Sequence, residues 1–129
     1  MRAVWRMVML GQEGSRFWLH YDNTVLASWQ AIVKGRKRFF VCPPSESEHL
    51  AELVLPKRST GKMSRTGNSR INPFGGRDNA IATQIPAKWA NKMGRTEPSS
   101  HELWAGLEKA ACFDDCVEEG EILYYPHKW

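Results

Sequence analysis

His20 and Asp22 are two metal-ligating residue types separated by one tyrosine, in a segment typical of a β-strand. Side chains at positions i and i+2 of a strand point to the same face, so this imidazole and this carboxylate can reach one small cation. Such a pair supplies two of the three ligands of the 2-His-1-carboxylate site that binds Fe(II) and leaves coordination positions open. The same spacing also recurs by chance, so its meaning depends on the rest of the sequence.

A second group of chemically informative residues lies on two predicted strands, 28–33 and 36–42, which a Lys34-Gly35 turn joins. We expect these strands to pair with each other as a β-hairpin. In that register one face carries Gln30, Ile32, Lys37, Phe39 and Val41. Because this face is mostly apolar, we expect it to be the interior, where Lys37 needs an anionic partner. A register shifted by one residue would instead bury two arginines, which is less favourable.

The other elements are short. Strands are expected over residues 4–10, 17–22, 28–33, 36–42, 113–117 and 121–125, and a short helix with a serine cap over 99–110. Residues 45–98 are polar, basic and glycine-bearing, and we expect them to form a long irregular insertion. Short strands with little helix and no βαβ alternation predict an all-β barrel or jelly roll.

The length of 129 residues fits one domain, here 1–129. The three cysteines are odd in number and form no C-x-x-C pair, so neither a disulfide framework nor a zinc site is indicated, and a reducing intracellular location (cytoplasm or nucleus) is expected. No cleavable signal peptide is predicted, and no apolar run approaches the ~20 residues that cross a bilayer.

The net charge of +4 permits a nucleic-acid partner without requiring one. The basic segment 57–70 is where such a contact would form. A solvated loop is the favoured interpretation of that segment, and nucleic-acid binding is the alternative.

Taken together, four segments of the chain resemble the jumonji-C and cupin-like 2-oxoglutarate oxygenases. They are His20-Tyr21-Asp22, the predicted hairpin 29–39, the Pro43-Pro44 stop and residues 117–129. Their order and spacing match as well, and the similarity covers nearly the whole chain except the middle loop. The hairpin is most similar to the branch of the arginine demethylase and lysyl hydroxylase.

The resemblance implies a double-stranded β-helix that holds Fe(II) through His20, Asp22 and a distal histidine, with 2-oxoglutarate as cosubstrate. Lys37 would bind the far carboxylate of 2-oxoglutarate, and Gln30 stands where relatives often carry an asparagine near the cosubstrate. Tyr21 should point away from the metal. Phe17 stands where many relatives have a hydroxyl residue, which implies one fewer hydrogen bond to the cosubstrate.

The sequence departs from the family pattern at its end, because the distal histidine would fall two positions beyond Trp129. His127 is the nearest histidine, but it occupies the turn rather than the ligand position. We therefore expect a barrel that is incomplete at the C-terminus. The implied function is a hydroxylase or demethylase domain acting on a protein or nucleic acid; the alternative is a catalytically inactive cupin-like binding or scaffold module.

Overall fold

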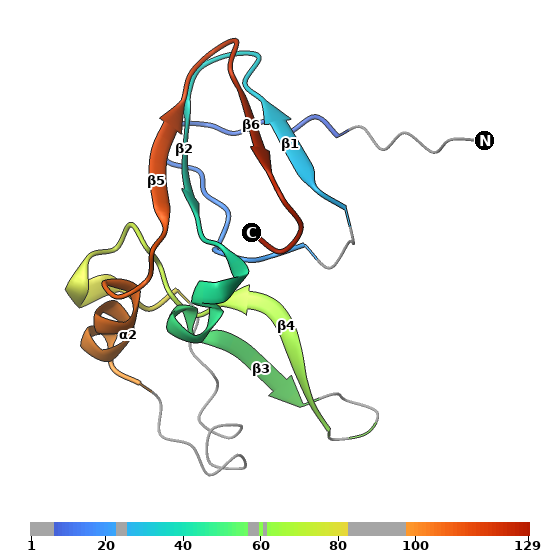
Figure 1. Cartoon of the computed structure of the whole chain (residues 1–129). Helices are drawn as coiled ribbons and strands as arrows, with labels where there is room; N and C mark the ends of the chain where they lie inside the picture. The colour runs from blue at the N-terminus through green and yellow to red at the C-terminus, as the bar shows by residue number, and fades with distance from the viewer. Residues whose placement is uncertain (1–6, 23–25, 57–59, 61, 83–97) are drawn as a thin grey trace.

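Most regular structure in this computed structural model is β-strand, in agreement with the sequence prediction (Figure 1). The structure describes residues 7–22, 26–56, 60, 62–82 and 98–129. The strands are β1 (Ser28–Ala31), β2 (Lys37–Val41), β3 (Glu52–Pro56), β4 (Met63–Ser69), β5 (Phe113–Val117) and β6 (Ile122–Tyr125). The helices are α2 (Ser100–Leu107) and the 3-10 helices η1 (Pro44–Leu50) and η2 (Arg77–Asn79). No helix in the described part of the chain has the length and hydropathy that a bilayer crossing requires.

The predicted hairpin between β1 and β2 is wrong, because each of these strands pairs with a strand from the C-terminal part of the chain. β1 pairs antiparallel with β6 and β2 pairs antiparallel with β5. The segment that links β1 to β2 and the segment that links β5 to β6 lie side by side at one end of the molecule (Figure 1). There the Ile32 amide donates a backbone hydrogen bond of 3.0 Å to the Glu121 carbonyl oxygen. Gly35, at a left-handed φ of 80°, therefore reverses the chain between two sheets rather than within one.

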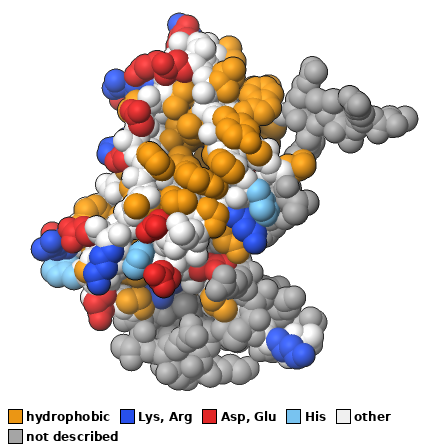
Figure 2. Space-filling view, viewed as in Figure 1, with side chains coloured by type: hydrophobic (Ala, Val, Ile, Leu, Met, Phe, Trp, Pro, Cys, Tyr) orange, Lys and Arg blue, Asp and Glu red, His pale blue; other side chains and the backbone are white. Residues whose placement is uncertain are grey.

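The inward face was nevertheless predicted correctly. Gln30, Ile32, Lys37, Phe39 and Val41 are all half-buried, whereas the two arginines of β2 and its preceding turn are exposed. Alternation depends on each strand alone, so it survives a change of partner strand. The outer face of the β1–β6 pair is apolar as well: Trp29, Ile122 and Tyr124 are exposed, and hydrophobic side chains gather over these strands in Figure 2.

Cys42 and Cys112 form a disulfide, so the expectation that the chain has none is wrong. Cys42 follows β2 and Cys112 precedes β5, and the last pair of that ladder is Val41 with Phe113, which sets the two cysteines directly opposite each other. They are 70 residues apart in sequence, and only the register of the two strands reveals the pairing. Cys116 is free and exposed.

The middle of the chain is more regular than predicted. Where an irregular insertion was expected over 45–98, the structure contains most of η1, the antiparallel pair β3–β4 and η2, while residues 83–97 lie outside the described residues. β4 also supports the segment that carries His20, because its last residues make backbone hydrogen bonds of 2.8 Å with Leu19 and Tyr21 and an isolated bridge joins His20 to Asn68.

The strands expected near the N-terminus are largely absent. Of the strand predicted over 17–22, the structure has only the bridge at His20. Of the strand predicted over 4–10, residues 7–10 are not in regular structure and 4–6 lie outside the described residues. The segment 17–22 is held by hydrogen bonds to β4 rather than by a sheet of its own.

The best-buried core lies at the α2 end of the molecule rather than between the β1–β6 and β2–β5 pairs. Ile71, Ala80, Leu103 and Leu107 form this core. α2 begins with a complete capping box, in which the Ser99 hydroxyl accepts from the Glu102 amide and the Glu102 carboxylate accepts from the Ser99 amide. This is the helix start that the sequence predicted.

Replacing Ser99 with alanine should lower the free energy of unfolding by about 1 kcal/mol, because the helix loses the acceptor for one of its unpaired N-terminal amides. Urea unfolding of the two proteins measures the difference. Ser47→Ala is the matched control, since Ser47 is exposed on η1 and lies outside the capping box. An equal loss in both variants would contradict a capping role for Ser99.

Candidate functional site

His20 and Asp22 lie close together, as their spacing predicted. His20 Nε2 is 3.7 Å from Asp22 Oδ1, and the two side chains are 42% and 52% exposed. His20 Nδ1 lies 2.6 Å from the carbonyl oxygen of Trp18, and because a carbonyl only accepts, Nδ1 carries the proton. With Nδ1 as the donor, Nε2 is the ring nitrogen left to face a cation, an orientation that metal-binding histidines typically gain from such a hydrogen bond.

Tyr21 points away from this pair. Its hydroxyl donates to Glu52 Oε1 at 2.9 Å, and the side chain is half-buried. Tyr21 thus anchors the segment to β3 on one side and leaves His20 and Asp22 on the other. Its position between His20 and Asp22 predicted this orientation.

The donor types at His20 and Asp22 fit Fe(II), but the described residues bring two candidate ligands together rather than three. Within that part of the chain, no group of three or more His, Cys, Asp or Glu side chains is placed to hold a metal ion. His127 does not join the pair; it is half-buried, and its Nδ1 is shielded from solvent with no hydrogen-bond partner among the described residues.

Lys37 and Gln30 are brought together although they lie in different sheets. Lys37 Nζ donates to Gln30 Oε1 at 2.9 Å, and Gln30 Nε2 donates to the Tyr125 hydroxyl at 2.9 Å. The register of β1 with β6 places Tyr125 diagonally across from Gln30. Tyr125 was not predicted as a site residue, although the alternation of β6 places its side chain on the more buried face.

The ammonium of Lys37 is partly desolvated and has mainly neutral surroundings. Its Nζ lies 4.7 Å from the ring centroid of Phe39 and 5.5 Å from that of Phe17. Burial lowers the pKa of Lys37. No carboxylate in the described part of the chain forms an ion pair with it, so the group is suited to binding an anion.

Phe17 connects Lys37 with the pair His20 and Asp22, because it precedes His20 by only three residues and its ring contacts Lys37 Nζ. At position 17, where the resemblance implied that a hydroxyl is missing, the phenylalanine ring instead makes a cation–π contact with Lys37. The two halves of the candidate site, the ammonium of Lys37 and the candidate ligands His20 and Asp22, are therefore carried by neighbouring parts of the fold.

A pocket that is partly open to solvent lies beside His20. Its walls are mainly apolar and include Leu19, Cys42, Pro43, Leu50 and Trp129. Trp129 stacks on Phe113, with ring centroids 6.1 Å apart. The pocket therefore joins the segment of His20 to the disulfide and to the last residues of the chain.

Comparison with known proteins identifies one relationship. The family model described as a cupin-like domain matches residues 6–129. No curated protein and no solved structure matches the chain. The match covers nearly the whole sequence and agrees with the antiparallel, mostly β architecture, while the arginine demethylase and lysyl hydroxylase branch stays a prediction. The chain therefore belongs to the family of cupin-like domains.

Proposed function

We propose that this domain serves an Fe(II)- and 2-oxoglutarate-dependent oxygenase, in which His20 and Asp22 are metal ligands and Lys37 binds the far carboxylate of 2-oxoglutarate. The observation that supports it best is Lys37: a half-buried ammonium without a carboxylate ion-pair partner among the described residues, touching the ring of Phe17 three residues before His20. When bound, iron and 2-oxoglutarate supply oxidation of a substrate by O2, with decarboxylation of the cosubstrate to succinate.

The protein's part in binding follows from the hydrogen bonds around Lys37. A carboxylate that accepts from Lys37 Nζ gains a charge-assisted bond and compensates for the partial desolvation of the ammonium. The Gln30 side chain accepts from Lys37 through its carbonyl oxygen and donates to the Tyr125 hydroxyl through its amide nitrogen. These two hydrogen bonds position the lysine before the ligand arrives. The rings of Phe17 and Phe39 limit the access of water to the ammonium.

The substrate is proposed to be a side chain of a protein or a nucleic acid, bound beside His20. A nucleic-acid contact through segment 57–70 would be salt-dependent, because it would release counterions from the phosphates. Arg70 does not contribute to such a surface, since it is only 7% exposed. Residues 57–59 and 61 of that segment lie outside the described residues.

A binding or scaffold module without catalysis is the second candidate function. It is favoured by one observation, namely that the described residues offer two metal ligands rather than three. Lys128 and Trp129 line the same pocket as His20, so a longer polypeptide would continue from a point close to the metal-ligand pair. Formation of succinate from 2-oxoglutarate by this chain, or by a longer one containing it, distinguishes the oxygenase from the binding module.

Binding of 2-oxoglutarate in the presence of Mn(II), measured by calorimetry, tests the proposal. Lys37→Met should weaken the binding by about tenfold, the lower end for a hydrogen bond to a charged group, because Lys37 is only half-buried. Lys34→Met is the matched control, since Lys34 is exposed and paired with Glu119. Equal affinity in wild type and Lys37→Met would reject Lys37 as the carboxylate-binding residue.

The lowered pKa of Lys37 predicts two opposite pH effects. Binding of 2-oxoglutarate should weaken as the pH rises toward 10.5, and the decline should begin below that ordinary lysine value, because the ammonium loses its proton earlier. The ligand-free protein should behave oppositely: the unfolded chain holds this proton to higher pH than the folded one, so the free energy of unfolding rises with pH across the same window. Urea unfolding at several pH values measures this slope, which Lys37→Met should flatten.

A further inference from the structure

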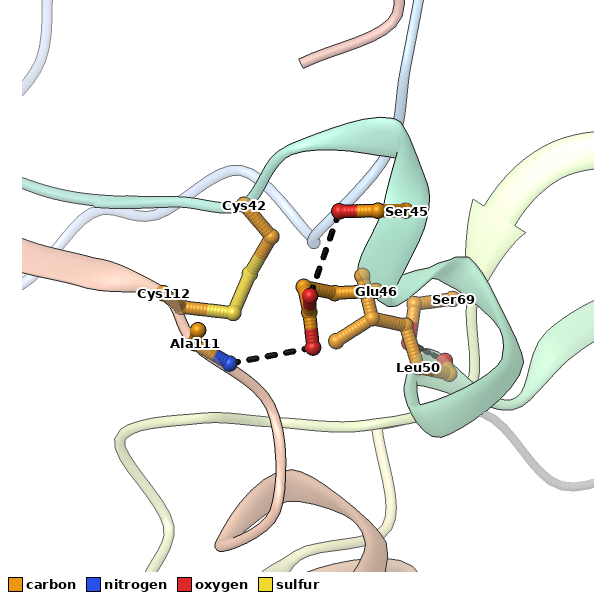
Figure 3. The surroundings of a disulfide bond; sticks show 7 residues. All are labelled: Cys42, Ser45, Glu46, Leu50, Ser69, Ala111 and Cys112. Atoms are coloured by element: carbon orange, nitrogen blue, oxygen red, sulfur yellow. Dashed lines mark hydrogen bonds between the residues drawn. A yellow bond between two sulfur atoms is a disulfide. The ribbon is translucent and has the colours of Figure 1, made fainter.

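The Cys42–Cys112 disulfide lies in the wall of the pocket that His20 lines. Cys42 is 4% exposed and is itself a lining residue, next in sequence to Pro43, another one. Figure 3 shows the bond between the end of β2 and the segment that enters β5, beside η1. One cysteine of the pair thus forms part of the pocket surface directly.

Cys112 is linked to the same pocket by the residues on either side of it in the sequence. Phe113, which follows Cys112, stacks on Trp129, a further lining residue. On the other side of Cys112, the Ala111 amide donates to the carboxylate of Glu46 in η1 at 3.1 Å. Both strands that the disulfide joins therefore contribute to the position of the pocket walls.

The disulfide also holds together the elements that carry the rest of the pocket. It closes a loop of the chain, with a sequence separation of 70, that contains η1, β3, β4, η2 and α2. β4 supports the backbone on either side of His20. Without the covalent link, the two ends of this loop, at β2 and β5, are held against each other by hydrogen bonds and packing alone.

We propose that the Cys42–Cys112 disulfide is a redox-sensitive link that holds the walls of the pocket beside His20 in place, and that its reduction loosens these walls. Cys112 is half-buried rather than fully buried, so the thiolate of a dithiol reductant attacks its sulfur and Cys42 leaves as the thiolate. The dithiol then becomes a disulfide, and two electrons and two protons pass to the pair of cysteines. This goes beyond the proposed oxygenase function, since the pocket wall loosens whether or not a metal or 2-oxoglutarate binds.

Thiol alkylation and amide hydrogen exchange of the full chain test this inference together. Before reduction, one thiol, Cys116, should react with iodoacetamide, and after treatment with dithiothreitol three should react. Reduction should speed amide exchange about tenfold or more in residues 42–50 and 126–129, because both segments line or flank the pocket, and leave α2 less affected. Reaction of Cys42 and Cys112 without reduction would overturn the proposal, as would unchanged exchange of both segments in the reduced protein.

Two variants distinguish the effect of breaking the disulfide from other effects of the reductant on the protein. Cys116→Ser should expose no reactive thiol before reduction and should respond to dithiothreitol as the wild type does. Cys42→Ser with Cys112→Ser should reproduce the fast exchange of the reduced protein and ignore dithiothreitol. If the double variant fails to fold, reduction of Cys116→Ser alone decides the question, because its only thiols then come from the disulfide.

Discussion

Replacing His20 with alanine is expected to weaken the binding of a divalent metal by about 100-fold and to abolish 2-oxoglutarate turnover in a catalytically competent chain. The variant leaves Asp22, whose side chain is 52% exposed, as the remaining member of the pair. Loss of an outer-shell partner already costs metal sites 10- to 100-fold, and loss of a ligand belongs at or above the upper end of that range. Titration with Co(II), followed by absorbance, measures the affinity without requiring turnover.

His101→Ala is the matched control for this experiment. His101 is an exposed histidine on α2 whose Nε2 lies 3.0 Å from Asp78, so its loss should leave metal affinity unchanged. Asp22→Asn keeps the shape of the carboxylate and removes its charge, and it should weaken binding in the same direction as His20→Ala. Metal affinity equal to wild type in both His20→Ala and Asp22→Asn would refute the assignment of the site.

Local alternation in the sequence predicted which side chains face inward, but it did not predict which strands pair. The two-residue alternation of side chains along a strand predicted that Gln30 and Lys37 share one face. The two side chains do meet, through a hydrogen bond of 2.9 Å. They meet between two sheets rather than across a hairpin, because β1 pairs with residues around Leu123 and β2 with residues around Val117. The partner of Gln30 is 93 residues away along the chain and the partner of Lys37 is 80 residues away, distances over which a local turn signal carries no information.

The parts of the site that escaped prediction depend on such distant contacts. The role of the Tyr125 hydroxyl follows from the β1–β6 register, which no nearby residue specifies. β4 was missed because its sequence, MSRTGNS, lacks apolar alternation, although its backbone supports the segment of His20. By contrast, the pairing of His20 with Asp22 and the capping box of α2 are local, and both were found from spacing.

Replacing Cys42 and Cys112 together with serine is expected to lower the free energy of unfolding by about 4 kcal/mol. In the chain-entropy description, a cross-link that closes a loop of 70 residues removes this much conformational freedom from the unfolded chain. The loss is large for a domain whose best-buried core, among the residues that the structure describes, consists of four side chains. Urea unfolding with circular dichroism measures the change, and Cys116→Ser, at an exposed position, should stay within about 0.5 kcal/mol of wild type.

Reduced wild-type protein provides the decisive comparison for this prediction. If the stability of the oxidised protein comes from the constraint on the unfolded chain, the reduced protein and the double serine variant should unfold at similar urea concentrations. A double variant much less stable than the reduced protein would instead place the effect in the packing of the Cys42 side chain, which is 4% exposed. A loss below about 1 kcal/mol in both would contradict the prediction, since the β2–β5 ladder and the Glu46–Ala111 hydrogen bond would then suffice to hold the two strands together.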